Sequence, residues 1–197
     1  PMMKAAVQAK MEGICHPVLL GNPDRLRRMA TRLKLDLTGI ELIDMRADQE
    51  QGRRATYAKH LAEKRARDGY TFQEAYDKMY ERNYFGMMMV ETGDADAFIT
   101  GLYTKYSNTI KVAKEVIGIR EENSTFGTMH IINSPKGVLY LADTLVNGDP
   151  NTDDLVDIAK LASRTVKFFN ETPNIALISY SNFGSDTAPG SLKVKNA

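Results

Sequence analysis

The sequence predicts an α/β protein whose mostly parallel, doubly wound sheets are arranged in two lobes. Short apolar runs alternate with segments of helical periodicity, which is the pattern of βαβ units around a parallel sheet. The length of 197 residues allows one domain or slightly more. A polar stretch at 121–124 is the expected hinge, so we place a first lobe at 1–122 and a second lobe at 123–197.

The first lobe opens in the middle of a helix, since helical periodicity begins at Pro1 with no capping residue ahead of it. Strands are predicted at 18–20 and 40–43 from their apolar runs. A helix starts between them at Pro23, because proline fits the first helical turn. A polar helix over 53–67 follows.

The second half of this lobe starts with a capping box. Thr71 is followed three residues later by Glu74, which is typical of a helix start. Periodicity continues from there, so one helix is predicted to run to Gly93. A buried strand at 97–101 and a helix beginning near Asn108 complete the lobe.

The second lobe contains the clearest hairpin of the sequence. Strands at 128–133 and 138–142 flank the turn at 134–137. A long helix follows Asn151, with two acidic residues in its first turn and apolar residues along one face. A last strand is predicted at 175–178, and the tail beyond the loop that follows has no periodicity.

Composition excludes several classes of partner. The net charge of +1 gives no reason to expect nucleic acid or an anionic membrane. No apolar run reaches the ~18 residues of a membrane helix, and the single Cys15 fits a reducing compartment, so a soluble, cytoplasmic protein is predicted. His16, His60 and His130 lack metal-ligand spacing, and the glycines match no dinucleotide fingerprint, so neither a metal nor NADP is expected in this stretch.

One candidate anion site combines Thr109 and Lys111 with Arg65. Free N–H groups at a helix N-terminus attract anions, and we expect Thr109 and Lys111 in an opening turn. Arg65 lies on the inward stripe of its helix and can clamp phosphate or carboxylate. An anion or a bridging acidic side chain is expected between the two cations. The alternatives are a solvated lysine and an arginine with a structural partner.

A second candidate site is the loop at 179–185. Its hydroxyls and its glycine suit a phosphate or a pantetheine group, and the candidate residues are Ser179, Ser181, Gly184 and Ser185. Such loops are common, so the loop alone specifies little. Asp143 follows a strand and is a further candidate for orienting a ligand, although an aspartate there more often caps the next turn.

Several motifs resemble the phosphate acetyl/butyryltransferase family and follow one another in the order typical of that family. They are PVLLGNP at 17–23, RARDGYT at 65–71, GDADAFITG at 93–101, NTIK at 108–111, YLADT at 140–144 and SYSNFGS at 179–185. The stretches RNYFGMMMV at 82–90 and GLYTKYS at 101–107 look most like the form fused behind NADP-dependent malic enzymes. The resemblance implies two α/β lobes with a cleft, similar to isocitrate and isopropylmalate dehydrogenases, and a dimer formed through the second lobe.

The resemblance also implies roles for individual residues. Arg65 looks like the arginine that contacts phosphate or the acyl group, and Thr109 like the threonine of the anion loop. Lys111 stands where an active-site arginine is expected, and it lacks the planar two-pronged donor of a guanidinium. The stretch 102–106 is bulky and basic where the transferases have small residues. A first strand with its arginine and a Ser-Arg stretch are missing, so the family fold looks incomplete at both ends.

The implied function is a regulatory and oligomerising domain that binds acetyl-CoA and has no catalytic residues of its own. Its parent would be an oxidoreductase, an oxaloacetate-decarboxylating malate dehydrogenase, that holds NADP and a divalent metal in an upstream malic enzyme domain. The alternatives are an active phosphate acetyltransferase, which moves acetyl between coenzyme A and phosphate, and a purely structural dimerisation module. We expect a homo-oligomer that is at least a dimer.

Overall fold

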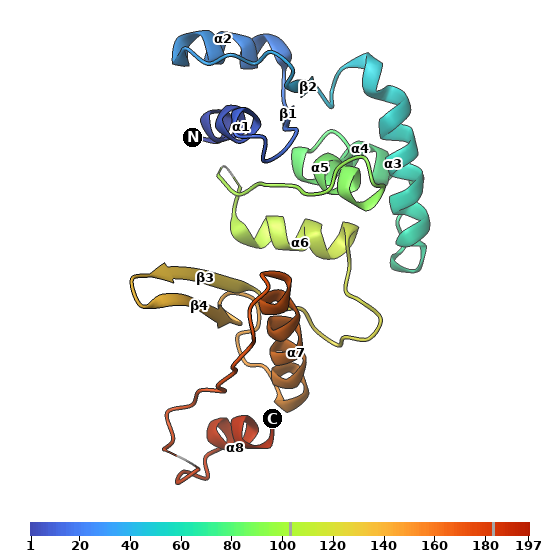
Figure 1. Cartoon of the computed structure of the whole chain (residues 1–197). Coiled ribbons are helices and arrows are strands. Elements are labelled where there is room, and N and C mark those ends of the chain that lie inside the picture. Colours follow the sequence, from blue (N-terminus) through green and yellow to red (C-terminus); the bar gives the residue numbers. More distant parts are fainter. Residues whose placement is uncertain (103, 183) are drawn as a thin grey trace. The chain divides into compact units, whose positions relative to one another are not determined.

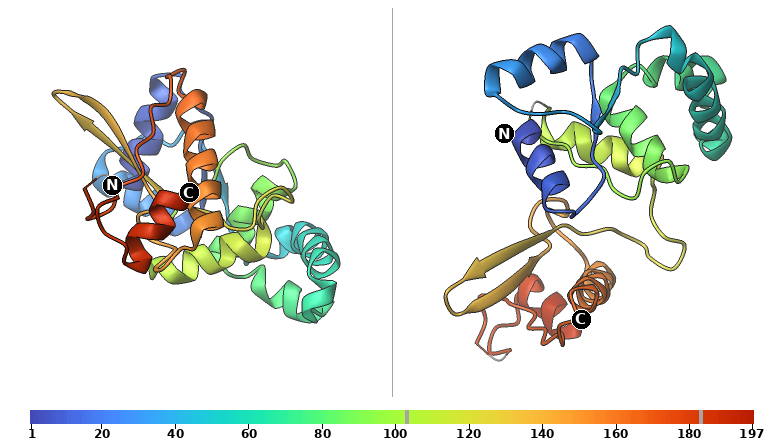
Figure 2. Two further views of the ribbon diagram at one scale, coloured as in Figure 1. Left: turned by 90° about the horizontal axis from the view of Figure 1, so that it is seen from below. Right: turned by 45° about the horizontal axis from the view of Figure 1, so that its top comes forward.

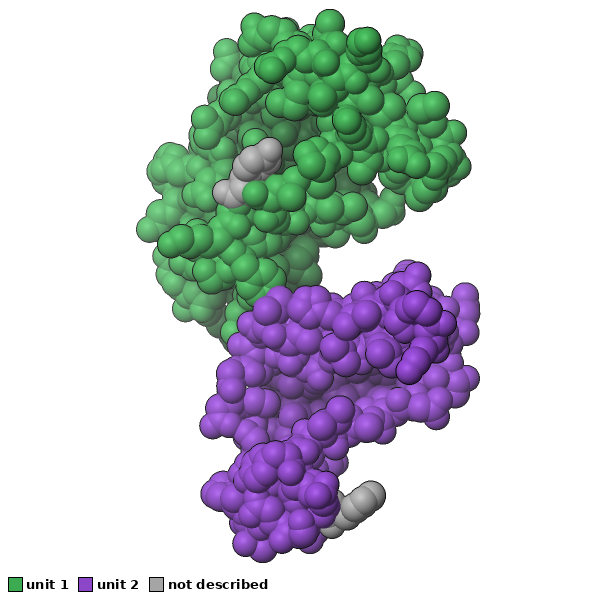
Figure 3. Space-filling view, turned by 90° about the vertical axis from the view of Figure 1, so that its left-hand side faces the viewer, with its two compact units in different colours: residues 1–118 green, residues 119–197 purple. Residues whose placement is uncertain are grey.

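This computed structural model describes residues 1–102, 104–182 and 184–197. The described residues contain eight α-helices, two short 3-10 helices and four strands (Figure 1). They form two compact units, residues 1–118 and 119–197 (Figure 3). The predicted α/β class is confirmed. The doubly wound sheet is not formed by the described residues, which give one parallel and one antiparallel strand pair. Whether the units correspond to the predicted lobes stays a prediction.

The first unit opens with α1 (Met2–Met11) and a parallel strand pair, β1 (Val18–Leu20) and β2 (Glu41–Ile43). Between the strands lies α2 (Pro23–Leu33), which begins at the predicted proline. The Asn22 side chain accepts a hydrogen bond from the Arg25 N–H at 3.0 Å and so satisfies one free donor of the helix start. These strand positions and this helix confirm the sequence prediction.

The core of the first unit is made largely by the helices that follow the strand pair. These helices, whose ribbons Figure 2 shows, are η1 (Asp48–Glu50), α3 (Gln51–Lys64), η2 (Ala66–Asp68), α4 (Phe72–Lys78), α5 (Arg82–Glu91) and α6 (Tyr106–Val116). The Tyr57 and Phe85 rings meet edge to face with centroids 5.2 Å apart. Tyr57, Phe85, Leu61, Met79 and Met88 are all fully buried. The three helices α3, α4 and α5 therefore share one apolar centre.

The predicted single helix from Thr71 to Gly93 is wrong, because α4 and α5 are separate helices. The Thr71–Glu74 capping box is present as predicted. α4 ends after Lys78, and Glu81 takes an extended conformation from which α5 starts anew. Buried residues continue on both sides of the break, so the apolar pattern alone does not reveal it.

The predicted strands at 97–101 and 175–178 are also wrong, since both segments are irregular. Within the described residues neither segment has a neighbouring strand to pair with. Apolar residues there stay open to solvent, with Ile99 at 76% and Ile178 at 84% exposure. A strand needs a hydrogen-bonded partner, which an apolar run does not supply by itself.

The second unit is built from the predicted hairpin and the long helix. β3 (Met129–Ser134) pairs antiparallel with β4 (Gly137–Ala142), and α7 (Thr152–Phe168) begins at an Asn151–Asp154 capping box. The rings of Tyr140 and Phe169 lie 6.2 Å apart and join the hairpin to the end of α7. The tail forms α8 (Pro189–Asn196), which was not predicted from the sequence because eight residues are too few to show periodicity.

No described helix has the length and apolarity to cross a membrane.

Candidate functional site

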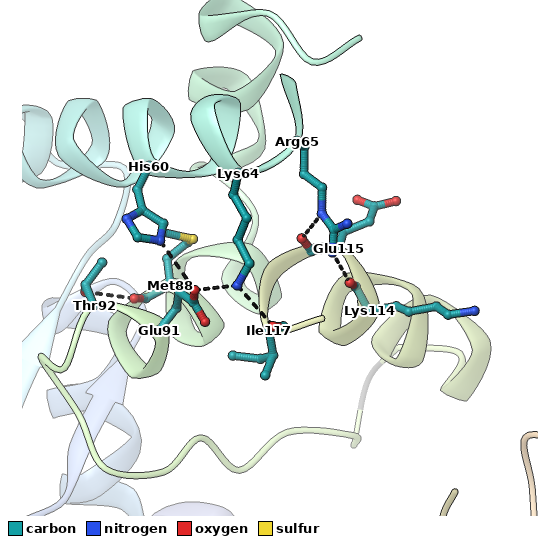
Figure 4. Close-up of polar contacts among 9 residues, drawn as sticks. All are labelled: His60, Lys64, Arg65, Met88, Glu91, Thr92, Lys114, Glu115 and Ile117. Atoms are coloured by element: carbon teal, nitrogen blue, oxygen red, sulfur yellow. Dashed lines mark hydrogen bonds and ion pairs between the residues drawn. The ribbon is translucent and has the colours of Figure 1, made fainter. Parts of the chain in front are cut away.

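Arg65 lies at the end of α3 and binds the C-terminal end of α6 (Figure 4). Its Nε donates to the Glu115 main-chain carbonyl at 2.7 Å, and its Nη2 donates to the Lys114 carbonyl. The last carbonyls of a helix are unsatisfied and carry a partial negative charge, which a cation stabilises. The positive charge of Arg65 therefore has partners within the chain. Its role as a ligand contact stays a prediction.

The neighbouring Lys64 extends this contact. Its Nζ donates to the Ile117 carbonyl at 3.0 Å and pairs with the Glu91 carboxylate at the end of α5. The same carboxylate lies 3.3 Å from Nε2 of His60. Figure 4 shows the three α3 side chains aligned against the ends of α5 and α6. This basic end of α3 thus fixes the last turn of α6.

Glu115 contacts Arg65 through its main-chain carbonyl and Lys111 through its carboxylate, so no described contact makes its side chain a bridge between the two cations. Its carboxylate accepts hydrogen bonds from the Tyr70 hydroxyl at 2.7 Å and from the Tyr84 hydroxyl, and it lies 3.8 Å from Nζ of Lys111. Burial alone would raise the pKa of Glu115, but the hydrogen bonds from Tyr84 and Tyr70 outweigh it and lower that pKa. Burial and the bond to this carboxylate raise the pKa of Tyr70 to about 12.

Lys111 does not lie in the opening turn of α6, contrary to prediction. The helix starts at Tyr106, before the predicted start, which moves Lys111 into the second turn. Its side chain is 70% exposed, so its pairing with Glu115 is solvated and weak. Thr109 does lie in the first turn, where its hydroxyl is 3.0 Å from that of Thr104 and 3.5 Å from Nδ2 of Asn83.

The loop of the second candidate site is held by its own hydroxyls. The Ser179 Oγ accepts from the Ser181 N–H at 3.2 Å, and the Ser181 Oγ accepts from the Asp186 N–H at 3.1 Å. Ser185 donates its N–H to the Asn182 carbonyl at 3.1 Å. Gly184 takes a φ of 77°, which favours glycine. Phe183 of this loop, and Tyr103 of the bulky stretch at 102–106, lie outside the described residues.

Asp143 organises the end of the hairpin. Its Oδ1 accepts from the Thr128 N–H at 2.8 Å and from the Thr128 hydroxyl at 2.6 Å. Its Oδ2 accepts from the Asn147 N–H at 2.6 Å and from the Asn147 side-chain amide at 2.8 Å. This is the turn-capping arrangement, the alternative to a ligand role. Whether Asp143 also orients a ligand stays a prediction.

The candidate residues fall into two groups. Arg65, Thr109 and Lys111 belong to the first unit, whereas Asp143 and the serine loop belong to the second. Within the first group, Arg65 contacts the main-chain carbonyl of Glu115 and Lys111 contacts its carboxylate. Thr109 lies in the first turn of α6, whereas Glu115 lies near its C-terminal end. Six residues of helix separate Thr109 from Glu115, which is about 9 Å along the axis.

Sequence reasoning missed the polar residues that connect the first group. Glu115, Tyr70, Tyr84 and Asn83 all contact a predicted site residue or one of its partners. The spacing of Lys111 and Glu115, four residues apart on one helix, was the available signal. The tyrosines and the asparagine come from other elements, so no local pattern links them to α6.

A sequence profile of the phosphate acetyl/butaryl transferase family matches residues 1–197, the whole chain. The chain belongs to the phosphate acetyl/butaryl transferase family. The family predicted from the motifs is thereby confirmed.

Relatives of two kinds share this family domain. An NADP-dependent malic enzyme of Escherichia coli is 31% identical over 94% of this chain, and a phosphate acetyltransferase of Synechocystis is 30% identical over all of it. The chain spans only 24% and 28% of the length of these relatives. The solved EutD phosphotransacetylase from Staphylococcus aureus has the same fold, with a TM-score of 0.85 over 98% of this chain and 58% of its own, at 24% identity.

Within this family domain, the two cations at Glu115 are expected to differ in their effect on stability. Arg65→Ala removes charged hydrogen bonds from a side chain that is only 24% exposed, so we expect unfolding to become easier by about 2 kcal/mol without any ligand. Lys111→Ala is expected to change the unfolding free energy by less than about 0.5 kcal/mol. Urea unfolding measures the free energy of unfolding of both variants. An equally small loss of unfolding free energy in the two would show that the α6 contact of Arg65 contributes little.

Proposed function

We propose that this chain is a phosphotransacetylase-like regulatory and oligomerising domain of an NADP-dependent malic enzyme, and that acetyl-CoA is its effector. The observation that carries the proposal is the 31% identity to a malic enzyme over nearly the whole chain. Lys111 favours regulation over transfer, since it is exposed and lacks the two-pronged geometry that holds an acyl phosphate. A site that binds acetyl-CoA and the transition state of acetyl transfer equally tightly binds the ligand without accelerating the transfer.

The parent protein would carry the oxidoreductase chemistry in its malic enzyme domain. That domain would hold NADP and the divalent metal and would convert malate to pyruvate in the cytoplasm. In the first unit, Thr109 is proposed as a contact for a phosphate of acetyl-CoA. The serine loop of the second unit is proposed separately, as a candidate contact for a phosphate or pantetheine group. Arg65 would contribute if it released the α6 carbonyls. Bound acetyl-CoA would lower the malic enzyme activity.

The second candidate function is an active phosphate acetyltransferase. The 30% identity to the Synechocystis enzyme over the whole chain favours it. An assay of the complete parent protein with acetyl-CoA and phosphate separates the two candidates. We expect a turnover far below the usual enzyme median of about 10 per second, because Lys111 and the bulky 102–106 stretch do not match the transferase pattern. A turnover near that median would overturn the regulatory assignment.

We infer that the parent completes two α/β lobes with a cleft, similar to isocitrate dehydrogenase. The likeness to the Staphylococcus aureus fold supports this, because this chain spans only 58% of it. The exposed apolar segments at 97–101 and 175–178 are the places where further strands would pair.

We also expect self-association through the second unit. On one face of the hairpin, Ile132, Leu139 and Leu141 are each at least 42% exposed, and such an apolar face favours burial against a second copy. Sedimentation should show a dimer that Leu139→Lys converts to a monomer. Met11→Lys is the control, since Met11 is an exposed apolar residue of the first unit. A monomer at tens of micromolar in the unmodified protein would contradict the expectation.

A further inference from the structure

Asn83 links two segments next to the first candidate site. It lies at the start of α5 and is 8% exposed. Its Oδ1 accepts a hydrogen bond from the Thr100 hydroxyl at 2.8 Å, and its Nδ2 lies 3.5 Å from the Thr109 hydroxyl oxygen. The Thr109 oxygen in turn lies 3.0 Å from that of Thr104. Four polar side chains thus form one continuous chain.

The chemistry of the Asn83 side chain indicates the direction of its two hydrogen bonds. A side-chain amide has one acceptor oxygen and one donor nitrogen. Thr100 occupies the oxygen of Asn83, so the nitrogen faces Thr109 and donates to it. A hydroxyl that accepts in this way still has its own hydrogen to donate. The hydrogen of Thr109 is therefore not used by Asn83, and either Thr109 or Thr104 can be the donor between their two hydroxyls.

Burial distinguishes the two partners of Thr109. Asn83 is buried, whereas Thr104 is exposed on the loop before α6. An incoming acceptor can replace Thr104 without disturbing the amide behind Thr109. An anionic oxygen is the better acceptor, because hydrogen bonds to charged groups are shorter and stronger than those between neutral groups.

We propose that Asn83 is a positioning residue that directs the Thr109 hydroxyl hydrogen toward a phosphate oxygen of the ligand. The inference rests on the proposed function, since it takes the acyl-CoA or phosphate site to include Thr109. It adds to that site a residue that does not contact the ligand. The site thereby offers a tetrahedral oxyanion a hydroxyl whose hydrogen is not used by Asn83.

Asn83→Asp is the sharpest test because it keeps the shape of the side chain and removes the amide donor that faces Thr109. A carboxylate would accept from both Thr100 and Thr109 and would turn the Thr109 hydrogen inward. Binding of acetyl-CoA to the complete parent protein is measured by calorimetry for Asn83→Asp and Asn83→Ala, each with Thr109 intact and with Thr109→Val. Thr109→Ser, which keeps the hydroxyl, is the conservative control.

We expect each Asn83 substitution to weaken acetyl-CoA binding about tenfold or more when Thr109 is intact. Asn83→Ala should have almost no further effect in the Thr109→Val background, and Thr109→Ser should retain tight binding. Equal weakening by Asn83→Ala in both backgrounds, with Thr109→Ser unaffected, would mean that Asn83 acts without Thr109 and would overturn this inference alone. If the unmodified parent does not bind acetyl-CoA, the proposed function fails, and this inference fails with it.

Discussion

Replacing Gly86 with alanine is expected to destabilise the protein by about 2 kcal/mol or more. Gly86 lies inside α5, and an added Cβ would come within 2.3 Å of Cε2 of the Phe98 ring. The three nearest atoms all belong to this ring, so Phe98 would have to move away from the helix. Alanine favours a helix over glycine by about 1 kcal/mol, which offsets only part of this cost.

Gly52→Ala in α3 is the matched control. A Cβ at Gly52 would meet no atom within 4 Å, and the backbone there is helical. This variant should be neutral or more stable by up to about 1 kcal/mol. Urea unfolding of both variants measures the difference. Equal stability of the Gly86 and Gly52 variants would contradict the close packing of Phe98 on α5.

Asp143→Asn is expected to cost about 3 kcal/mol. Both carboxylate oxygens of Asp143 accept hydrogen bonds, one from Thr128 and the other from Asn147. In asparagine, the amide nitrogen would replace one of these oxygens and would face the donors of either Thr128 or Asn147. Donors without acceptors at a partly buried position are costly. Asp149→Asn is the control, because the Asp149 side chain is 93% exposed and, within the described part of the chain, pairs only with Lys193. Equal losses in the two variants would show that the Asp143 bonds do not hold the turn.

The stability that Asp143 provides should also depend on pH. Burial alone would raise the pKa of Asp143, but hydrogen bonds from Thr128, Asn147 and Leu145 outweigh it and hold that pKa well below its ordinary value. A group with a lowered folded pKa stabilises fully above its unfolded pKa of about 3.9. The difference in unfolding free energy between Asp143 and Asp143→Asn should therefore be constant near neutral pH and shrink as pH falls below about 4.

Local signals in the sequence predicted the elements that are stabilised locally. The hairpin at 134–137, the cap at Asn151 and the Thr71–Glu74 box all depend on neighbours a few residues apart. The strands predicted at 97–101 and 175–178 are not formed, because a strand needs a distant partner that an apolar run does not supply. The break between α4 and α5 was missed because buried residues continue across it.

The candidate site shows the same division. Thr109 does lie in the first turn of α6, although the helix starts at Tyr106, before the predicted start near Asn108. The partners of Arg65 were not predictable, since the α6 carbonyls lie about 50 positions further along the chain. Asn83 lies in the RNYFGMMMV stretch, but that motif does not indicate its hydrogen bonds, and only the fold brings it between Thr100 and Thr109.

Titration of the complete parent protein with acetyl-CoA tests the central claim most directly. The rate of malate-dependent NADPH formation is measured as acetyl-CoA is added. If this chain is the regulatory domain, the rate should fall along a saturable curve, and Thr109→Val should shift that curve to about tenfold or more higher acetyl-CoA. A rate that stays constant at every acetyl-CoA concentration would contradict the account.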